Sequence, residues 1–206
     1  MARLHKELLL LILLLASQVV FSQLRIEITG GTDDPIRVAV VPIQWNLEIA
    51  PRLYLHEVIK NDLESFGEFY VLKPDEMLSY PTSEEDVYFR DWKLLLVDYL
   101  IVGTVLPDQD QDQDQDQDSI KVNYSIIDVS RKKVIHKSII SGSAKFIKRI
   151  GHNISDKIYE QINGLSGIFS TRIAYVDKPA GTNDRYDLRI TDLDGDNNLS
   201  LFSSPQ

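Results

Sequence analysis

Alternating and periodic hydrophobic positions divide the sequence into short strands and amphipathic helices. Residues 36–41 form an apolar, β-branched run that Pro42 closes, which predicts a buried strand. Apolar residues at spacings of four, four and three positions then predict a helix with Pro51 in its first turn and Gly67 at its end. The same criteria predict further strands at 69–72, 100–106, 120–126 and 134–140, and a short helix at 88–96.

The clearest helix is predicted at residues 144–162, with Ser143 as its candidate N-cap and Gly164 as its terminator. One stripe of this helix consists of Ile147, Ile150, Ile154, Ile158 and Ile162. The order of the elements predicts an α/β fold, a mixed β-sheet with helices on its faces. The expected hairpins between residues 100 and 140 argue against a purely parallel sheet.

The pattern changes after Gly167, where three short strands are expected at 172–176, 187–191 and 199–202. Loops rich in Gly, Asn and Asp join them, as in an antiparallel propeller blade. A propeller blade has four strands, so we expect an incomplete blade at the end of this sequence. The sequence therefore predicts three regions: a leader at 1–22, an α/β domain at 23–166, and the partial first blade of a truncated β-propeller at 167–206.

The first 22 residues have the organisation of a secretory signal peptide. Arg3 and Lys6 precede an apolar run at 8–16, which is shorter than the ~20 residues that span a bilayer. Small side chains near the end of the leader predict cleavage between Ser22 and Gln23. We therefore expect an exported protein with no direct membrane insertion after cleavage.

Composition narrows the classes of function. The chain has 31 acidic and 22 basic residues and a net charge of −9, which argues against a nucleic-acid partner. Its basic cluster lacks interleaved aromatic residues and is interpreted as a solvated hairpin tip; it consists of Arg131, Lys132, Lys133 and Lys137. The absence of cysteine excludes disulfides, thiolate nucleophiles and Cys-ligated zinc.

An unusual repeat from Asp108 to Asp118 alternates six Asp with five Gln. Carboxylates are calcium ligands, so a periplasmic calcium-binding module is kept as an alternative interpretation of the protein's function. The Gly and Glu that complete an EF-hand loop are, however, missing from the repeat. A solvated loop is the preferred interpretation, because like charges repel. We expect this loop to lie near Lys145, Lys148 and Arg149, and to offset their unfavourable interaction with the N-terminal end of the last helix.

Other candidate chemistry has little support in the sequence. Residues 192–198 resemble a calcium loop, but Gly195 is at the wrong offset, and a tight turn is expected. His56, His136 and His152 occur on separate elements, which favours packing over zinc or acid/base roles. Because nucleophile and nucleotide-binding motifs are also missing, we expect no catalytic residue, no cofactor, no metal and no enzyme activity.

Three blocks of sequence resemble the TolB family, periplasmic proteins of the Tol-Pal system that have an α/β N-terminal domain followed by a six-bladed propeller. The first runs from Arg25 to the motif VVPIQW at 40–45, and the second is DYLIVGTV at 98–105. The third and most specific runs from Arg149 to Val176 and continues into YDLRITDLDGDN at 186–197. The resemblance covers nearly all of the expected mature chain, apart from the Asp-Gln repeat and the rest of the propeller.

The resemblance implies a non-enzymatic adaptor that supports outer-membrane integrity and invagination during cell division. In this family the N-terminal segment of the mature chain docks onto the C-terminal domain of TolA, and the propeller binds the lipoprotein Pal. The matching segment here is Gln23, Leu24, Arg25, Ile26, Glu27, Ile28 and Thr29. Since most of the propeller is missing from this sequence, the resemblance implies Pal binding for full-length relatives rather than for this chain.

The proposed docking segment has the pattern of a strand. Leu24, Ile26 and Ile28 alternate with polar residues, which suits recognition by strand addition. The other interpretation is that this strand covers an edge of its own domain's sheet. Both interpretations hold if the strand can detach from its own sheet and bind the partner.

Overall fold

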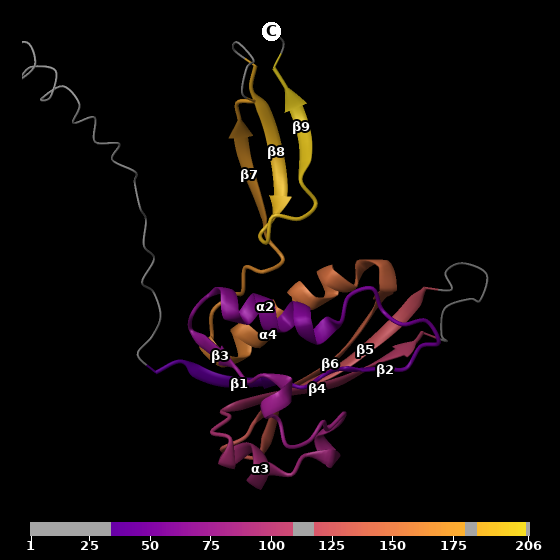
Figure 1. The fold of residues 1–206 in the computed structure, drawn as a ribbon, viewed down its shortest axis with the longest axis vertical. Helices are drawn as coiled ribbons and strands as arrows, with labels where there is room; N and C mark the ends of the chain where they lie inside the picture. The colour runs from indigo at the N-terminus through magenta and orange to yellow at the C-terminus, as the bar shows by residue number, and fades with distance from the viewer. Residues whose placement is uncertain (1–33, 109–117, 180–184, 205–206) are drawn as a thin grey trace, which may run out of the picture.

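The computed structural model describes residues 34–108, 118–179 and 185–204. It contains a large mixed sheet with helices on both faces and a smaller sheet of three strands (Figure 1). Within these ranges, no helix has the length and apolar character needed to cross a membrane.

The large sheet has the strand order β3-β1-β4-β5-β6, and β2 also pairs with β4. The strands are β1 (Ile36–Val40), β2 (Gln44–Trp45), β3 (Phe69–Val71), β4 (Tyr99–Pro107), β5 (Ser119–Asp128) and β6 (Lys133–Ser143). β1 is parallel to β3 and β4, whereas β4, β5 and β6 are antiparallel neighbours. The mixed sheet that the sequence predicts is therefore confirmed.

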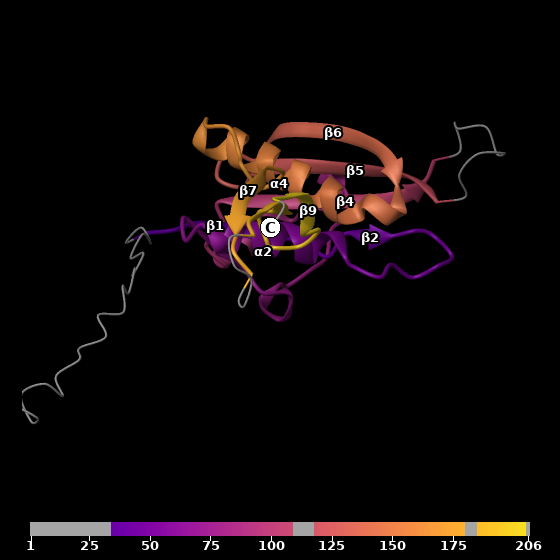
Figure 2. The same ribbon diagram turned by 90° about the horizontal axis from the view of Figure 1, so that it is seen from above.

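Two helices cover one face of this sheet, α2 (Leu55–Ser65) and α4 (Ile147–Asn163), as Figures 1 and 2 show. The isoleucine stripe of α4 faces the sheet, and Ile154 and Ile158 are fully buried in the main core. The opposite face is covered by α3 (Phe89–Leu94) and by the short turns η1 (Pro74–Glu76) and η2 (Glu84–Asp86). There, Trp92 is buried in a second apolar cluster.

One predicted helix start is wrong, and a second differs in its detail. α2 begins at Leu55, so Pro51 lies before the helix and not in its first turn. The second helical segment begins at Ala144 as predicted, with the short 3-10 helix η3 (Ala144–Phe146), whose N-cap position is Ser143; α4 follows directly, with Phe146 as its own N-cap. The Ser143 side chain makes no cap hydrogen bond; this residue is also the last of β6 and is buried. Gly164 does end α4, with a left-handed φ of 72°.

The smaller sheet consists of β7 (Arg172–Asp177), β8 (Asp187–Asp192) and β9 (Leu199–Ser203), paired antiparallel in that order. It fits a partial propeller blade, as the sequence predicts. The expected tight turn joins β8 to β9, with positive φ values of 87° at Gly195 and 52° at Asn197. Its tip reaches back toward α2 and α4 (Figure 1).

Candidate functional site

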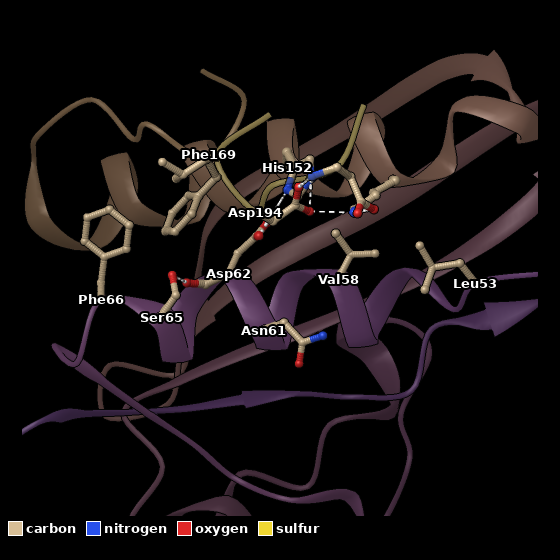
Figure 3. A pocket seen from close by; sticks show the side chains of 12 residues that line it. Leu53, Val58, Asn61, Asp62, Ser65, Phe66, His152, Phe169 and Asp194 are labelled. Atoms are coloured by element: carbon tan, nitrogen blue, oxygen red, sulfur yellow. Dashed lines mark hydrogen bonds and ion pairs between the residues drawn. The ribbon is translucent and has the colours of Figure 1, made fainter. Parts of the chain in front are cut away.

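A cavity of about 550 Å³ lies where α2 and α4 meet the β8–β9 turn (Figure 3). Its apolar lining includes Val58 and Phe66, Phe169 from the segment that follows α4, and Leu193 from the turn. Leu193 also packs against the main core cluster. The cavity is therefore built jointly by the helical layer and the smaller sheet.

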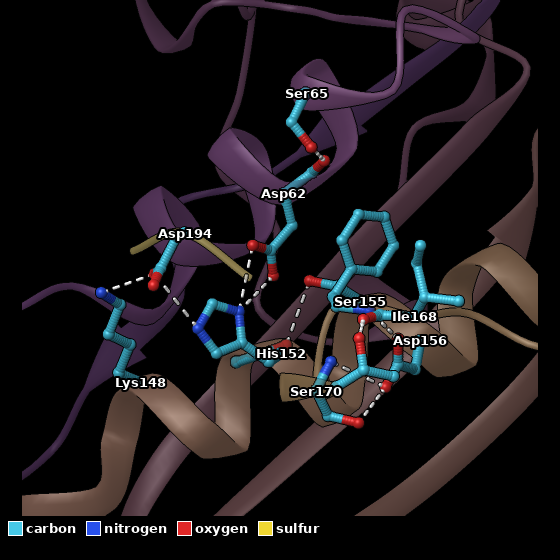
Figure 4. A network of polar contacts seen from close by, with 12 residues as sticks. Asp62, Ser65, Lys148, His152, Ser155, Asp156, Ile168, Ser170 and Asp194 are labelled. Atoms are coloured by element: carbon cyan, nitrogen blue, oxygen red, sulfur yellow. Dashed lines mark hydrogen bonds and ion pairs between the residues drawn. The ribbon is translucent and has the colours of Figure 1, made fainter. Parts of the chain in front are cut away.

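The polar side of the cavity is a network centred on His152 (Figure 4). The His152 Nδ1 atom lies 2.9 Å and 3.0 Å from the two carboxylate oxygens of Asp62. A carboxylate can only accept at this distance, so we assign a proton to Nδ1. The other ring nitrogen, Nε2, lies 3.5 Å from the Asp194 carboxylate, and Lys148 Nζ lies 2.6 Å from that same carboxylate.

Burial and charge shift the titration of these groups. The hydrogen bond to Asp62 raises the pKa of His152 above its ordinary value, and the charge of Asp194 adds to this, while burial and Lys148 oppose it. Burial alone would lower the pKa of Lys148, but its hydrogen bonds to Asp194 and Asp196 leave that pKa raised. Burial would likewise raise the pKa of Asp194, yet the bond to Lys148 holds that pKa below its usual range. The network therefore favours the charged forms of His152, Lys148 and Asp194.

Close packing of the two helices brings Asp62 and His152 together. Gly151 of α4 faces α2, and a Cβ atom at this position would lie 2.6 Å from Cγ1 of Val58. The missing side chain lets the helices approach, and the next residue, His152, then meets Asp62. Lys148 lies four residues before His152, one helical turn away, and so presents its ammonium group on the same side.

The segment between α4 and β7 is held by Asp156. Its carboxylate accepts from the backbone N–H of Phe169 at 2.6 Å and of Ser170 at 3.2 Å. The fully buried Phe169 ring packs against Phe66 with ring centroids 4.9 Å apart. This fixes the point at which the chain leaves the α/β domain.

Replacing Asp156 by alanine is expected to lower the free energy of unfolding by about 1–3 kcal/mol, because the Phe169 N–H would lose its acceptor in a part-buried position. Urea unfolding followed by circular dichroism measures the loss. Glu160→Ala on the same helix is the matched control, since its exposed pair with Lys157 should contribute less than about 1 kcal/mol. We call this attachment of the segment by Asp156 the clamp. Equal losses of stability in the two variants would contradict it.

The sequence-predicted docking residues Gln23 to Thr29 and the cleavage site at Ser22 lie outside the described residues. Asp34 is the first residue of the described ranges and lies just ahead of β1, which starts at Ile36. β1 is an interior strand, whereas β3 and β6 are the two ends of the sheet. Of these two, β6 is the longer, with eleven residues.

The interior of the Asp-Gln repeat also lies outside the described residues. Of its acidic residues, Asp108 pairs with Lys121 at 3.1 Å, and the Asp118 carbonyl accepts from the Ala144 N–H at 2.8 Å. In the ranges that the structure describes, no three His, Asp or Glu side chains are grouped as a metal site would require. The calcium alternative thus stays a prediction.

The prediction that the Asp-Gln repeat lies near Lys145, Lys148 and Arg149 falls mainly on residues 109–117, which lie outside the described ranges. Lys148 pairs with Asp194 and Asp196 of the β8–β9 turn and not with the described acidic residues of the repeat. Lys145 and Arg149 lie over the ring of Phe146. Chain reversal after β8 thus brings two aspartates to Lys148 near the start of α4.

Comparison with known proteins identifies the family. The model of the TolB amino-terminal domain matches residues 24–135. The Tol-Pal system protein TolB of Hahella chejuensis is 34% identical over 96% of this chain and 45% of its own length. The protein of the same name from a Marinomonas strain is 35% identical over 84% of this chain and 39% of its own length.

A solved structure of a TolB protein is also similar to this chain. The crystal structure of TolB from Acinetobacter baumannii superposes with a TM-score of 0.68 and 28% identity, covering 88% of this chain and 42% of that chain. The chain thus spans under half the length of these relatives. It belongs to the TolB family and contains the family's amino-terminal domain.

Proposed function

We propose that this protein is a non-enzymatic periplasmic adaptor of the Tol-Pal system, which supports outer-membrane integrity and invagination during cell division. Family membership carries this proposal, because the matched relatives are Tol-Pal system proteins named TolB. The predicted signal peptide at 1–22 supports export.

The docking element of the proposal is the segment Gln23–Thr29, with the C-terminal domain of TolA as its partner. Leu24, Ile26 and Ile28 alternate with polar residues, so in an extended conformation they share one face. The segment precedes β1, which already has a neighbour on each side in β3 and β4. An extended segment with this alternation suits addition to the sheet of a partner, where backbone hydrogen bonds give affinity and alternate side chains give register.

The test is binding of the purified 23–206 chain to the TolA C-terminal domain by isothermal titration calorimetry. Changing Ile26 and Ile28 together to aspartate should weaken binding by tenfold or more, about 1.4 kcal/mol, because two charges would enter an apolar interface. Changing the alternate residues Arg25 and Glu27 to glutamine should alter it by less than about threefold. Binding that survives deletion of 23–29 would contradict the docking proposal.

A further inference from the structure

We propose that His152 is a proton-controlled latch: its protonated form holds the β8–β9 turn against α2 and α4, and its neutral form releases that turn. The latch consists of His152, Asp62, Asp194 and Lys148 (Figure 4). It concerns the coupling between the two sheets and goes beyond the docking proposed for the N-terminal segment.

The geometry gives the two protonation states opposite effects. Asp62 occupies Nδ1 at 2.9 Å, so the second proton of a charged imidazole must sit on Nε2. In the described part of the chain, the Nε2 atom is buried without a hydrogen-bond partner and faces the Asp194 carboxylate at 3.5 Å. A protonated Nε2 attracts this carboxylate, whereas the lone pair of a neutral Nε2 repels it.

Charged groups from two helices and the β8–β9 turn meet at the latch. α2 contributes Asp62, α4 contributes Lys148, and the turn contributes Asp194 and, through Lys148, Asp196. Three carboxylates therefore face two cations when His152 is charged, and only Lys148 when it is neutral. Loss of the His152 proton leaves an excess of negative charge around a buried imidazole and the buried Asp62, which is unfavourable.

The pH dependence follows from the direction of the shift. The hydrogen bond to Asp62 raises the pKa of His152 in the folded protein, against the opposing effect of burial. The stabilisation is therefore fully present below the unfolded pKa of about 6.5 and is lost as pH rises through the higher folded value. Asp194 and Lys148 keep their charges in this window, because the pKa of Asp194 is lowered and that of Lys148 is raised.

The experiment measures the distance between the smaller sheet and α2. Because the protein contains no cysteine, Glu64→Cys on α2 and Ser200→Cys on β9 can be spin-labelled selectively, and both positions are exposed. Double electron–electron resonance should give a narrow distance distribution at about pH 5.5 and a clearly broader one at about pH 9. Identical distributions at the two pH values would overturn the proposal.

Three variants separate the latch from other pH effects. His152→Asn can still bond Asp62 but cannot gain a charge, so its distribution should be broad at both pH values. Asp194→Asn should lose most of the pH response. Asp196→Asn is the matched control, because it removes a Lys148 partner but leaves the His152 contact intact, and it should retain the response. A response that persists in His152→Asn, or disappears in Asp196→Asn, would overturn the assignment to His152.

Proton NMR titration of the imidazole gives a second readout. The pKa of His152 should lie above about 6.5 in the wild-type protein and should fall in Asp194→Asn. Asp194 is exposed, so this variant is expected to fold. An unchanged His152 pKa in Asp194→Asn would show that the turn does not sense the proton, and would contradict the latch.

Discussion

Ile154→Ala is expected to lower the free energy of unfolding by about 3–4 kcal/mol, because it leaves a cavity in the centre of the main core. Ile154 is fully buried on the face of α4 that packs onto the large sheet. Its neighbours are side chains of strands and helices that are fixed in place by the sheet, so the core cannot collapse fully into the space. Urea unfolding monitored by circular dichroism gives the value.

Ile139→Ala is the matched control for this loss. It is the same chemical change, but the Ile139 side chain on β6 is 64% exposed. The expected change is within about 0.5 kcal/mol. Similar losses in the two variants would show that the α4 stripe is not the centre of the core.

Gly103→Ala is expected to cost about 2–3 kcal/mol of stability, because a side chain at this position collides with backbone. Gly103 lies on β4 opposite Tyr124 of β5. A Cβ atom there would lie 2.4 Å from the carbonyl oxygen of Asn123 and 3.2 Å from the Cα atom of Tyr124. Neither atom can move without disturbing the pairing of two central strands, so small local movements cannot relieve the strain.

Gly142→Ala on β6 provides the comparison for Gly103→Ala. The nearest atom to its new methyl group is the Cδ1 end of Ile150, at 3.2 Å, which can adjust. The expected change is less than about 1 kcal/mol. Thermal unfolding of both variants measures the difference, and a large loss in Gly142→Ala alone would contradict this account of β4 and β5.

The strands and helices could largely be predicted because each has a local pattern. The isoleucines of α4 recur on one stripe, and Gly164 ends the helix in the left-handed conformation that glycine tolerates. Helix starts were less predictable. Ser143 occupies the N-cap position of η3, as its residue type indicates, but it also pairs with β5 and makes no side-chain cap bond, and α4 itself begins three residues later than η3.

The polar network could not be predicted because its members are far apart in sequence. Asp62 and His152 are separated by 90 positions, and only the packing of α2 on α4 joins them. The sequence pattern assigned His152 to packing, which is true of its burial but misses its two carboxylate neighbours. The nearest local signal was the i, i+4 spacing of Lys148 and His152, which places them on the same side of one helix.

The clamp made by Asp156 determines which movements remain when the β8–β9 turn is released. Phe169 stays buried and its N–H stays bonded to Asp156, since neither depends on the His152 proton. The smaller sheet then has one fixed attachment and one reversible attachment. We therefore expect the released sheet to rotate about residues 167–171. The loss of a single proton would thus change the angle between the smaller sheet and the α/β domain.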